Sequence, residues 1–315
     1  MAHLKNSSKT YTLASGDKIP AIGLGTWQSS KDQTVRAVEA ALAAGYRYID
    51  TAAGYGNESE VGQGLNNSGI PREQVWITTK LNNPDHKRAP EALEESLKNL
   101  GVDYLDLWLM HWPCSTDPSK ENAHYEDWDF VDTWREMQKL LATGKIRNIG
   151  VSNFGITNME KLLNHPSCKI VPAVNQIELH PNNPSFRLVQ YCQDKGIHLT
   201  GYSCLGSTNS PLYKDPTLLS IAKAKGKTPQ QCLLQWGIQH GWDVIPKSVT
   251  ASRIQDNFDL DGWDLTENEM KKLDALPDRF KVGNDDWLPI KVFFGDDEGP
   301  VRSQDEKTIK NRSSL

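Results

Sequence analysis

The stretch Asp50-Thr-Ala-Ala-Gly-Tyr55 decides how this chain is interpreted. Asp50 ends a short apolar run, and Tyr55 follows in a loop between two glycines. Two later apolar runs also end on functional side chains, the first on Lys80 and the second on His111. In a (β/α)8 barrel the carboxyl ends of the strands meet at one face, where active sites lie. The sequence therefore predicts that an acid, a phenol, an ammonium and an imidazole share one site.

The rest of the chain alternates apolar runs with segments of helical periodicity. Apolar runs without polar alternation are typical of a parallel sheet covered by helices, and eight such units favour an α/β fold closed into a (β/α)8 TIM barrel. The expected strands are 22–27, 48–50, 75–80, 105–111, 148–152, 173–177, 197–202 and 244–245. A hairpin expected at 10–22 is too small to be stable alone, so we expect it to plug one end of the barrel.

Helix boundaries carry their own signals. Gly45 is a plausible C-cap after a segment with helical spacing, and Asp215-Pro216 and Thr228-Pro229 each combine an N-cap residue with proline at the first helical position. The segment Thr266–Glu269 is a capping box that opens a last helix. Further helices are expected at 58–65, 89–100 and 131–143 and from about residue 252.

One barrel domain is expected over residues 1–295, followed by a polar tail, 296–315, that has little to bury and is expected to be poorly ordered. Trp287, Phe293 and Phe294 are expected to pin the segment before this tail onto the barrel as a loop over the substrate site. The polar loop 113–129 is long for a barrel, which marks it as functional or mobile.

Composition excludes several classes of protein. A formal net charge of −5 and a pI near 5.9 argue against a nucleic-acid partner. The five cysteines are scattered and form no CxxC pair, so neither a disulfide framework nor a metal site is predicted, and a reduced, cytoplasmic setting is expected. No apolar stretch approaches the roughly 18 residues of a spanning helix, so we expect a soluble protein with no membrane partner.

The four strand-end residues suit proton delivery to a carbonyl oxygen. A tyrosine has a pKa of about 10, and an ammonium at ~4 Å stabilises its ionised form by an energy on the order of 4 kcal/mol. A fall of one to three pKa units is therefore available to Tyr55 from Lys80 before burial opposes it. Asp50 can keep Lys80 protonated, and His111 can donate a hydrogen bond to the carbonyl oxygen. Another group must supply a hydride.

The sequence contains no G-x-G-x-x-G, since Gly23-Leu-Gly25 lacks the third glycine, so a Rossmann site is not predicted. Other strand ends carry amide, hydroxyl and aromatic groups that can bind a carboxamide and stack on a flat ring. These are Ser152, Asn153, Gln176, Tyr202 and Ser203. Lys247 and Arg253 flank the start of a helix, whose N–H groups favour a phosphate; surface ion pairs are the alternative for the two cations.

These motifs resemble the aldo-keto reductase family, and within it the fungal branch of glycerol dehydrogenases and glyceraldehyde reductases. The matching stretches are Gly23-Leu-Gly-Thr-Trp27, Asp50-Thr-Ala-Ala-Gly-Tyr-Gly-Asn-Glu58, Thr79-Lys80, His111-Trp-Pro113, Gly150-Val-Ser-Asn-Phe154, Asn175-Gln176, Tyr202-Ser203 and Ile245-Pro-Lys-Ser248. The resemblance implies a barrel that binds NADP(H), with Tyr55 as general acid, Asp50 and Lys80 as its tuning pair and His111 as the residue that orients the substrate.

The resemblance also implies positions for the cofactor and the substrate. The cofactor contacts are Gly25, Thr26, Trp27, Ser152, Asn153, Gln176, Tyr202, Ser203, Leu205, Ser207, Pro246, Lys247, Ser248, Val249, Thr250, Arg253, Asp256 and Asn257. Among these, Lys247, Ser248 and Arg253 match the positions that hold the 2′-phosphate. The expected walls of the substrate pocket are Trp27, Trp112, Trp128 and Trp287. Trp27 and Trp112 have a core role as the alternative, and His180 is interpreted as structural.

The chain departs from the family pattern in three places. The segment Gly206–Asp215 is shorter than the loop that folds over the pyrophosphate in members resembling aldose reductase, so cofactor grip and release are expected to differ. Asp256 stands where a glutamate commonly contacts adenine, and Cys204 replaces a frequent proline.

The resemblance implies an NADPH-dependent reductase of aldehydes and ketones, either aromatic or derived from small polyols or sugars, that also oxidises alcohols with NADP+. Two alternatives stay open at this point. Lys80 could form an imine, as in barrel aldolases, or the chain could sense NADP without turnover. The only expected partner is the small-molecule substrate, and a monomer is expected, with a dimer as the alternative.

Overall fold

The structure is a computed structural model that describes residues 5–208, 210–276 and 280–295. Eight parallel strands lie beside one another in chain order in a single sheet. They are β3 (Leu24–Gly25), β4 (Tyr48–Asp50), β5 (Trp76–Leu81), β6 (Leu105–Met110), β7 (Ile146–Ser152), β8 (Val174–Glu178), β9 (His198–Tyr202) and β10 (Asp243–Val244). The expectation for the tail 296–315 lies outside the described residues.

The first and last strands meet, and the sheet closes. Ile22 pairs with Val244 in a parallel bridge, and Gly25 pairs with Lys247. The Gly23 N–H donates to the Val244 carbonyl at 2.9 Å, and the Val244 N–H donates to the Ala21 carbonyl at 3.0 Å. Gly25 is required at this seam because a Cβ there would lie 2.8 Å from the Ile245 carbonyl oxygen. The predicted (β/α)8 barrel is confirmed.

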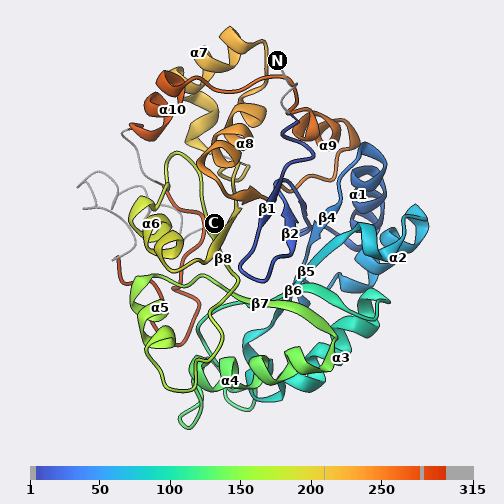
Figure 1. The fold of residues 1–315 in the computed structure, drawn as a ribbon, viewed down its shortest axis with the longest axis vertical. Helices are drawn as coiled ribbons and strands as arrows, with labels where there is room; N and C mark the ends of the chain where they lie inside the picture. The colour runs from blue at the N-terminus through green and yellow to red at the C-terminus, as the bar shows by residue number, and fades with distance from the viewer. Residues whose placement is uncertain (1–4, 209, 277–279, 296–315) are drawn as a thin grey trace.

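Helices surround the strands on all sides in the view of Figure 1. They are α1 (Lys31–Ala44), α2 (Glu58–Ser68), α3 (Ala89–Leu100), α4 (Phe130–Leu140), α5 (Ile156–Leu163), α6 (Phe186–Asp194), α7 (Pro216–Lys225), α8 (Pro229–His240), α9 (Ala251–Phe258) and α10 (Glu267–Asp274). Short 3-10 turns are η1 (Ala53–Tyr55), η2 (Arg72–Gln74), η3 (Asn83–Arg88), η4 (Leu141–Thr143) and η5 (Pro211–Lys214).

The predicted helix caps form. Gly45 follows α1 with a φ of 110°, a left-handed conformation that glycine adopts without strain. Asp215 accepts a hydrogen bond from the Leu218 N–H at the start of α7, and Thr228 accepts one from the Gln231 N–H at the start of α8. Thr266 caps α10 in the same way. Side-chain oxygens thus satisfy N–H groups that the first helical turn leaves without partners.

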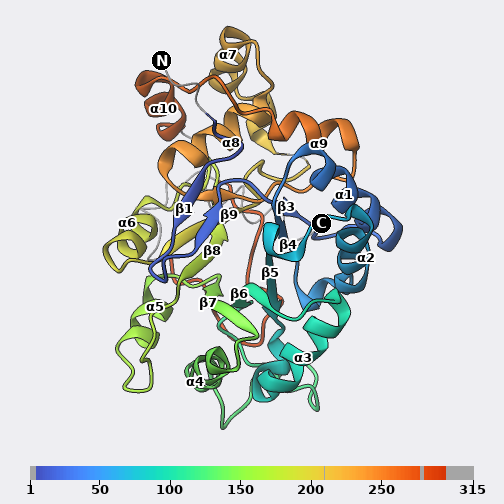
Figure 2. The same ribbon diagram turned by 45° about the vertical axis from the view of Figure 1, so that its right-hand side comes forward.

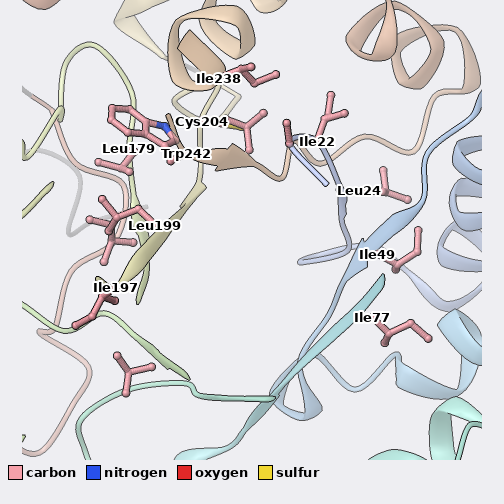
Figure 3. Packing of buried hydrophobic residues seen from close by; sticks show 14 of the residues in the cluster. Ile22, Leu24, Ile49, Ile77, Leu179, Ile197, Leu199, Cys204, Ile238 and Trp242 are labelled. Atoms are coloured by element: carbon pink, nitrogen blue, oxygen red, sulfur yellow. The ribbon is translucent and has the colours of Figure 1, made fainter. Parts of the chain in front are cut away.

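Alternate residues along each strand belong to two buried layers, one outside the barrel and one inside it. Ile22, Leu24, Ile49 and Ile77 follow one another around the outer face of the strands, where the helices cover them (Figure 3). The neighbouring residues along the strands, such as Tyr48, point into the barrel because successive side chains of a strand face opposite ways. Asp50 therefore lies on the inner side, two residues beyond Tyr48.

The N-terminal hairpin fills one end of the barrel. Its strands β1 (Thr10–Thr12) and β2 (Lys18–Pro20) pair antiparallel, and they lie across the strands in Figures 1 and 2. Leu13 and Ile19 are buried in the same cluster as the barrel interior. The hairpin therefore acts as the predicted plug, and functional groups gather at the opposite rim.

The segment 280–295 packs against the barrel through residues that differ in part from those predicted. Leu288 and Val292 are buried beside Trp112 and Cys114, and Phe293 packs against this cluster. Phe294 is 46% exposed and does not pin the segment. Among the described helices, none is both long and apolar enough to cross a membrane.

Candidate active site

The four strand-end residues lie together at the open rim. Lys80 on β5 donates to Asp50 Oδ1 at 2.6 Å and to the Thr51 carbonyl at 2.8 Å, and its Nζ lies 3.4 Å from the Tyr55 hydroxyl. The side chains of Lys80 and Asp50 are 0% and 2% exposed. A buried cation is thus held between a carboxylate and a phenol, as the sequence predicts.

His111 completes the group at the end of β6. Its ring lies 5.6 Å from the ring of Tyr55, with the two planes at 72°. Asp50, Tyr55 and His111 line a cavity of about 990 Å³, whereas Lys80 lies beneath its wall. A carbonyl oxygen in this cavity can therefore meet a hydroxyl and an imidazole but not the ammonium itself.

The charge state of Lys80 follows from its partners. Burial alone lowers the pKa of an ammonium, but the Asp50 carboxylate and the Tyr55 oxygen outweigh this and raise the pKa of Lys80 above its ordinary value. Lys80 is therefore protonated at neutral pH. Asp50 accepts a second hydrogen bond from Gln176 Nε2 at 2.7 Å, so both carboxylate oxygens are used.

The expected fall in the pKa of the Tyr55 hydroxyl is wrong. Burial raises the pKa of the Tyr55 hydroxyl, and the opposing effect of Lys80 is smaller, so the net pKa lies above its usual value near 10. Charge attraction between Lys80 and a phenolate is present, as expected, but desolvation of the phenolate exceeds it. Tyr55 therefore holds its proton at neutral pH, as a proton donor must.

His111 is a neutral imidazole. Burial lowers its pKa well below the usual value, and the Lys80 ammonium lowers it further. A neutral imidazole donates one hydrogen bond and carries no charge, which suits it to orient a carbonyl oxygen.

Amide and hydroxyl groups from three further strands form a connected network beside these residues. Ser152 Oγ donates to the Gln176 carbonyl at 2.9 Å, and Tyr202 OH donates to Asn153 Oδ1 at 2.7 Å. Asn153 Nδ2 donates to the His111 carbonyl at 3.0 Å. Asn153 and Ser203 have positive φ angles of 63° and 46°, a conformation that costs energy for non-glycine residues and that clusters at functional sites.

Part of the cavity lining is cationic. Lys247 and Arg253 line it beside the N-terminus of α9, and neither forms an ion pair with a carboxylate in the described part of the chain. Lys247 Nζ donates to the Gln28 carbonyl oxygen at 3.4 Å. The N-cap residue Thr250 makes no side-chain hydrogen bond to the helix, so the first-turn N–H groups of α9 can meet an anion.

Every residue that the sequence assigns to the cofactor lines this single cavity. The set comprises Gly25, Thr26, Trp27, Ser152, Asn153, Gln176, Tyr202, Ser203, Leu205, Ser207, Pro246, Lys247, Ser248, Val249, Thr250, Arg253, Asp256 and Asn257. Trp27, Trp112 and Trp287, which the sequence assigns to the substrate pocket, line the same cavity.

Trp128 differs from the expectation and lies outside the cavity lining. Its Nε1 donates to Thr133 Oγ1 at 2.9 Å at the start of α4, and the Lys87 ammonium lies 6.0 Å from its ring centre. The loop 113–129 is thus drawn toward α4, since Asp129 caps that helix by accepting from the Val131 N–H. Loop length alone does not determine which way its aromatic side chain points.

Sequence reasoning missed several lining residues. Asn82 lies two residues beyond Lys80, so the strand-end rule that found Lys80 could also have found it. Gln28, Tyr213, Gln230 and Asn284 also line the cavity, and no motif in the sequence marks them. Among the described residues, no group of three or more His, Cys, Asp or Glu could hold a metal ion.

The fold and the site define a class of protein: a parallel barrel enzyme whose rim carries a proton-donating phenol next to a buried ammonium, at one end of a long cavity with a cationic far end. The model of the aldo/keto reductase family matches residues 21–278. The chain belongs to this family, as the sequence motifs predict.

Relatives are similar over nearly their whole length. The chain is 42% identical over 311 residues to the glycerol 2-dehydrogenase (NADP(+)) of Saccharomyces cerevisiae, covering 93% of this chain and 99% of that protein. It is 44% identical over 291 residues to the aldehyde reductase YPR1 of the same yeast, covering 87% and 93%. The solved aldose reductase of Schistosoma japonicum superposes with a TM-score of 0.82 at 38% identity, covering 87% of this chain and 94% of that one.

Proposed function

We propose that this protein reduces aldehydes and ketones to alcohols with NADPH and runs the reverse oxidation with NADP+. The observation that carries the proposal is the position of the Lys80 ammonium. It is held at 2.6 Å by Asp50 and lies 3.4 Å from the Tyr55 hydroxyl, at the edge of a cavity that continues to Lys247 and Arg253.

The cavity fits NADP(H) by its size and by the chemistry of its lining. A volume of about 990 Å³ lies at the upper end of the range for ligand pockets. The cationic end offers Lys247, Arg253 and the N-terminus of α9 to phosphate groups. Ser152, Asn153 and Gln176 offer amide and hydroxyl groups to a carboxamide near Tyr55. When bound, the cofactor supplies the hydride.

Residues of the chain carry out the proton transfer. Tyr55 donates its proton to the carbonyl oxygen as the carbonyl carbon gains the hydride, which yields a neutral alcohol and leaves a phenolate. Lys80 stabilises that phenolate, and Asp50 keeps Lys80 charged. The neutral His111 donates a hydrogen bond that orients the oxygen. Reprotonation of Tyr55 restores the site for the next turnover.

The substrate end of the cavity favours neutral carbonyl compounds. Trp27, Trp112 and Trp287 offer aromatic faces, and Asn82 and Asn284 offer amides to hydroxyl groups. Within the described lining, the basic side chains Lys247 and Arg253 belong to the opposite, cationic end. We therefore propose aldehydes derived from small polyols or sugars, and aromatic aldehydes, as substrates. Sugar acids are expected to be reduced more slowly because a buried carboxylate needs a cationic partner.

The two alternatives are less well supported. An imine-forming lysine must be neutral and must reach a carbonyl carbon. Lys80 is instead fully buried, donates two short hydrogen bonds and lies outside the cavity lining. A protein that senses NADP without turnover has no need for Tyr55 and Lys80, yet both stand in position for catalysis.

The direct test is a panel of carbonyl compounds with NADPH and with NADH, monitored by absorbance of the reduced cofactor. Glyceraldehyde and 4-nitrobenzaldehyde should be reduced, with NADPH preferred. Tyr55→Phe should lower kcat by about 10³-fold or more because it removes the general acid, while cofactor affinity stays within about twofold. Wild-type turnover in that variant would remove the mechanism, and borohydride trapping of an adduct on Lys80 would favour the aldolase instead.

The proposal includes a monomeric, cytoplasmic enzyme with residues 1–295 as one domain. The hairpin and the segment 280–295 both pack on the barrel, which supports one domain, and the scattered cysteines support a reducing compartment. Size-exclusion chromatography with light scattering would give the mass, and a value near 35 kDa is expected.

A further inference from the structure

Glu178 is a buried carboxylate to which the proposed reaction gives no role. It ends β8, two residues after Gln176, so both side chains leave the strand on the same side. Glu178 is buried and does not line the large cavity. A buried carboxylate is costly unless donors surround it, so its partners indicate what it does.

Two of its partners come from a segment more than one hundred residues away. The Val282 N–H donates to Glu178 Oε1 at 2.7 Å, and the Gly283 N–H donates to Oε2 at 2.7 Å. His180 Nε2 lies 2.8 Å from Oε1, the same oxygen that accepts from Val282. Figure 1 shows the segment 280–295, in red, running beside α6 and α5. One side chain at a strand end therefore fixes two successive peptide groups of the C-terminal segment.

Gly283 fits between this carboxylate and the site. A Cβ at Gly283 would lie 2.8 Å from the Tyr202 hydroxyl and 3.3 Å from Glu178 Oε2. The Tyr202 hydroxyl in turn donates to Asn153 Oδ1 at 2.7 Å. Only glycine allows the segment to approach this closely.

The fixed peptides lead directly into the wall of the substrate end. Val282, Gly283, Asn284 and Trp287 all line the cavity. Trp287 Nε1 donates to the Asn284 carbonyl at 3.1 Å, and its ring meets Trp112 edge-on at 5.3 Å. Trp287 is nevertheless 56% exposed, so its own burial holds it weakly. The position of this wall therefore depends on where the chain is held.

A second set of contacts joins Asp285 to the far end of the segment. Asp285 Oδ2 accepts from the Val292 and Phe293 N–H groups at 2.7 and 2.8 Å, and Asn158 Nδ2 donates to the Val292 carbonyl at 3.0 Å. Asp285 ties the middle of the segment to 292–293, so loss of the Glu178 contacts should loosen Val282, Gly283 and Asn284 without releasing 292–293. The effect should be confined to the wall of the cavity.

We propose that Glu178 is a positioning residue that sets substrate selectivity, because it fixes the C-terminal wall formed by Asn284 and Trp287. This inference rests on the proposed reductase function. A carboxylate can accept from all three donors at once, whereas a glutamine would turn an N–H group toward one of them. Glu178→Gln keeps the size of the side chain but removes its ability to accept from all three donors at once.

The test compares a large and a small aldehyde in Glu178→Gln. The KM for 4-nitrobenzaldehyde, whose ring must pack on the wall, should rise about 10-fold, whereas that for glyceraldehyde should change by less than about twofold. The Kd for NADPH, measured by cofactor fluorescence, should also stay within about twofold. Hydrogen exchange of the peptide that contains Val282 and Gly283 should become faster. Glu136→Gln, at an exposed ion pair on α4, is the matched control and should change none of these.

Gly283→Ala provides a second test that leaves the sequence of β8 unchanged. The added methyl group should move the same segment away from the Tyr202 hydroxyl. It should give the same difference between the two aldehydes, and it decides the matter if Glu178→Gln does not fold. Equal KM changes for both aldehydes, or unchanged KM values in either folded variant, would overturn the inference. If the wild-type protein reduces neither aldehyde with NADPH, the proposed function fails instead.

Discussion

Removal of the Lys80 ammonium should damage both stability and chemistry, by amounts that the structure allows us to estimate. In Lys80→Met, the buried Asp50 carboxylate loses the ammonium that lies 2.6 Å from it in the wild type. Breaking a buried pair from one side costs about 3–5 kcal/mol of the free energy of unfolding. At 3.4 Å and an effective dielectric of about 20, the ammonium stabilises a Tyr55 phenolate by roughly 5 kcal/mol. Loss of this term should lower kcat by about 10³-fold.

A double variant separates the two effects. Asp50→Asn combined with Lys80→Met removes both charges, so the penalty for an unpaired carboxylate disappears. The double variant should be at least about 2 kcal/mol more stable than Lys80→Met alone, yet equally inactive, because Tyr55 still lacks its cation. Urea unfolding followed by tryptophan fluorescence gives the stabilities, and NADPH oxidation gives kcat.

Lys139→Met is the matched control for the loss of an ammonium. Lys139 pairs with Glu136 at 2.8 Å, but the two side chains are 63% and 25% exposed. Such exposed pairs contribute about 1 kcal/mol or less. Unfolding of Lys80→Met at the same urea concentration as Lys139→Met, or a kcat above about a tenth of the wild-type value, would contradict these roles of Lys80.

Three further predictions follow from single side chains. Arg253→Ala should raise the KM for NADPH at least about 10-fold more than that for NADH, since a phosphate loses its bidentate partner; equal changes in initial-rate assays would contradict this. Burial lowers the pKa of His86 from 6.5 to about 3, so the stability it contributes is present above pH 6.5 and is lost as pH falls toward 3. Between pH 7 and pH 5 the wild type should therefore lose about 2 kcal/mol from this group, and His86→Asn should lack that loss in urea titrations at the two pH values. Trp287→Ala should raise the KM for 4-nitrobenzaldehyde, whereas Trp128→Ala should not, since only Trp287 lines the cavity; the opposite order would place the substrate elsewhere.

The strand ends could be predicted because the signal is local. An apolar run that ends on Asp50 or Lys80 shows both a buried strand and the polar group at its tip. Barrel closure then brings those tips to one rim, so spacing along the chain is enough to predict neighbours in space. Helix caps such as Gly45 and Thr266 could be found for the same reason, since each depends on a few adjacent residues.

Properties that depend on competing or long-range interactions could not be predicted in this way. The sequence shows that Lys80 stands near Tyr55, but not that burial outweighs the ammonium and raises the phenol's pKa. It marks Trp128 as an aromatic in a long loop, but not that its indole turns to Thr133. Desolvation and side-chain direction both depend on what the rest of the chain places nearby.

The sequence by itself determined the barrel, the family and the four residues proposed for catalysis, because strand periodicity and strand-end chemistry are written in short stretches. Only the tertiary structure decided the charge states, the extent of the cavity and the contact between Glu178 and Val282. That contact joins positions 104 residues apart. No local pattern encodes such a pairing, because it exists only after the barrel has closed and the C-terminal segment has packed across its rim.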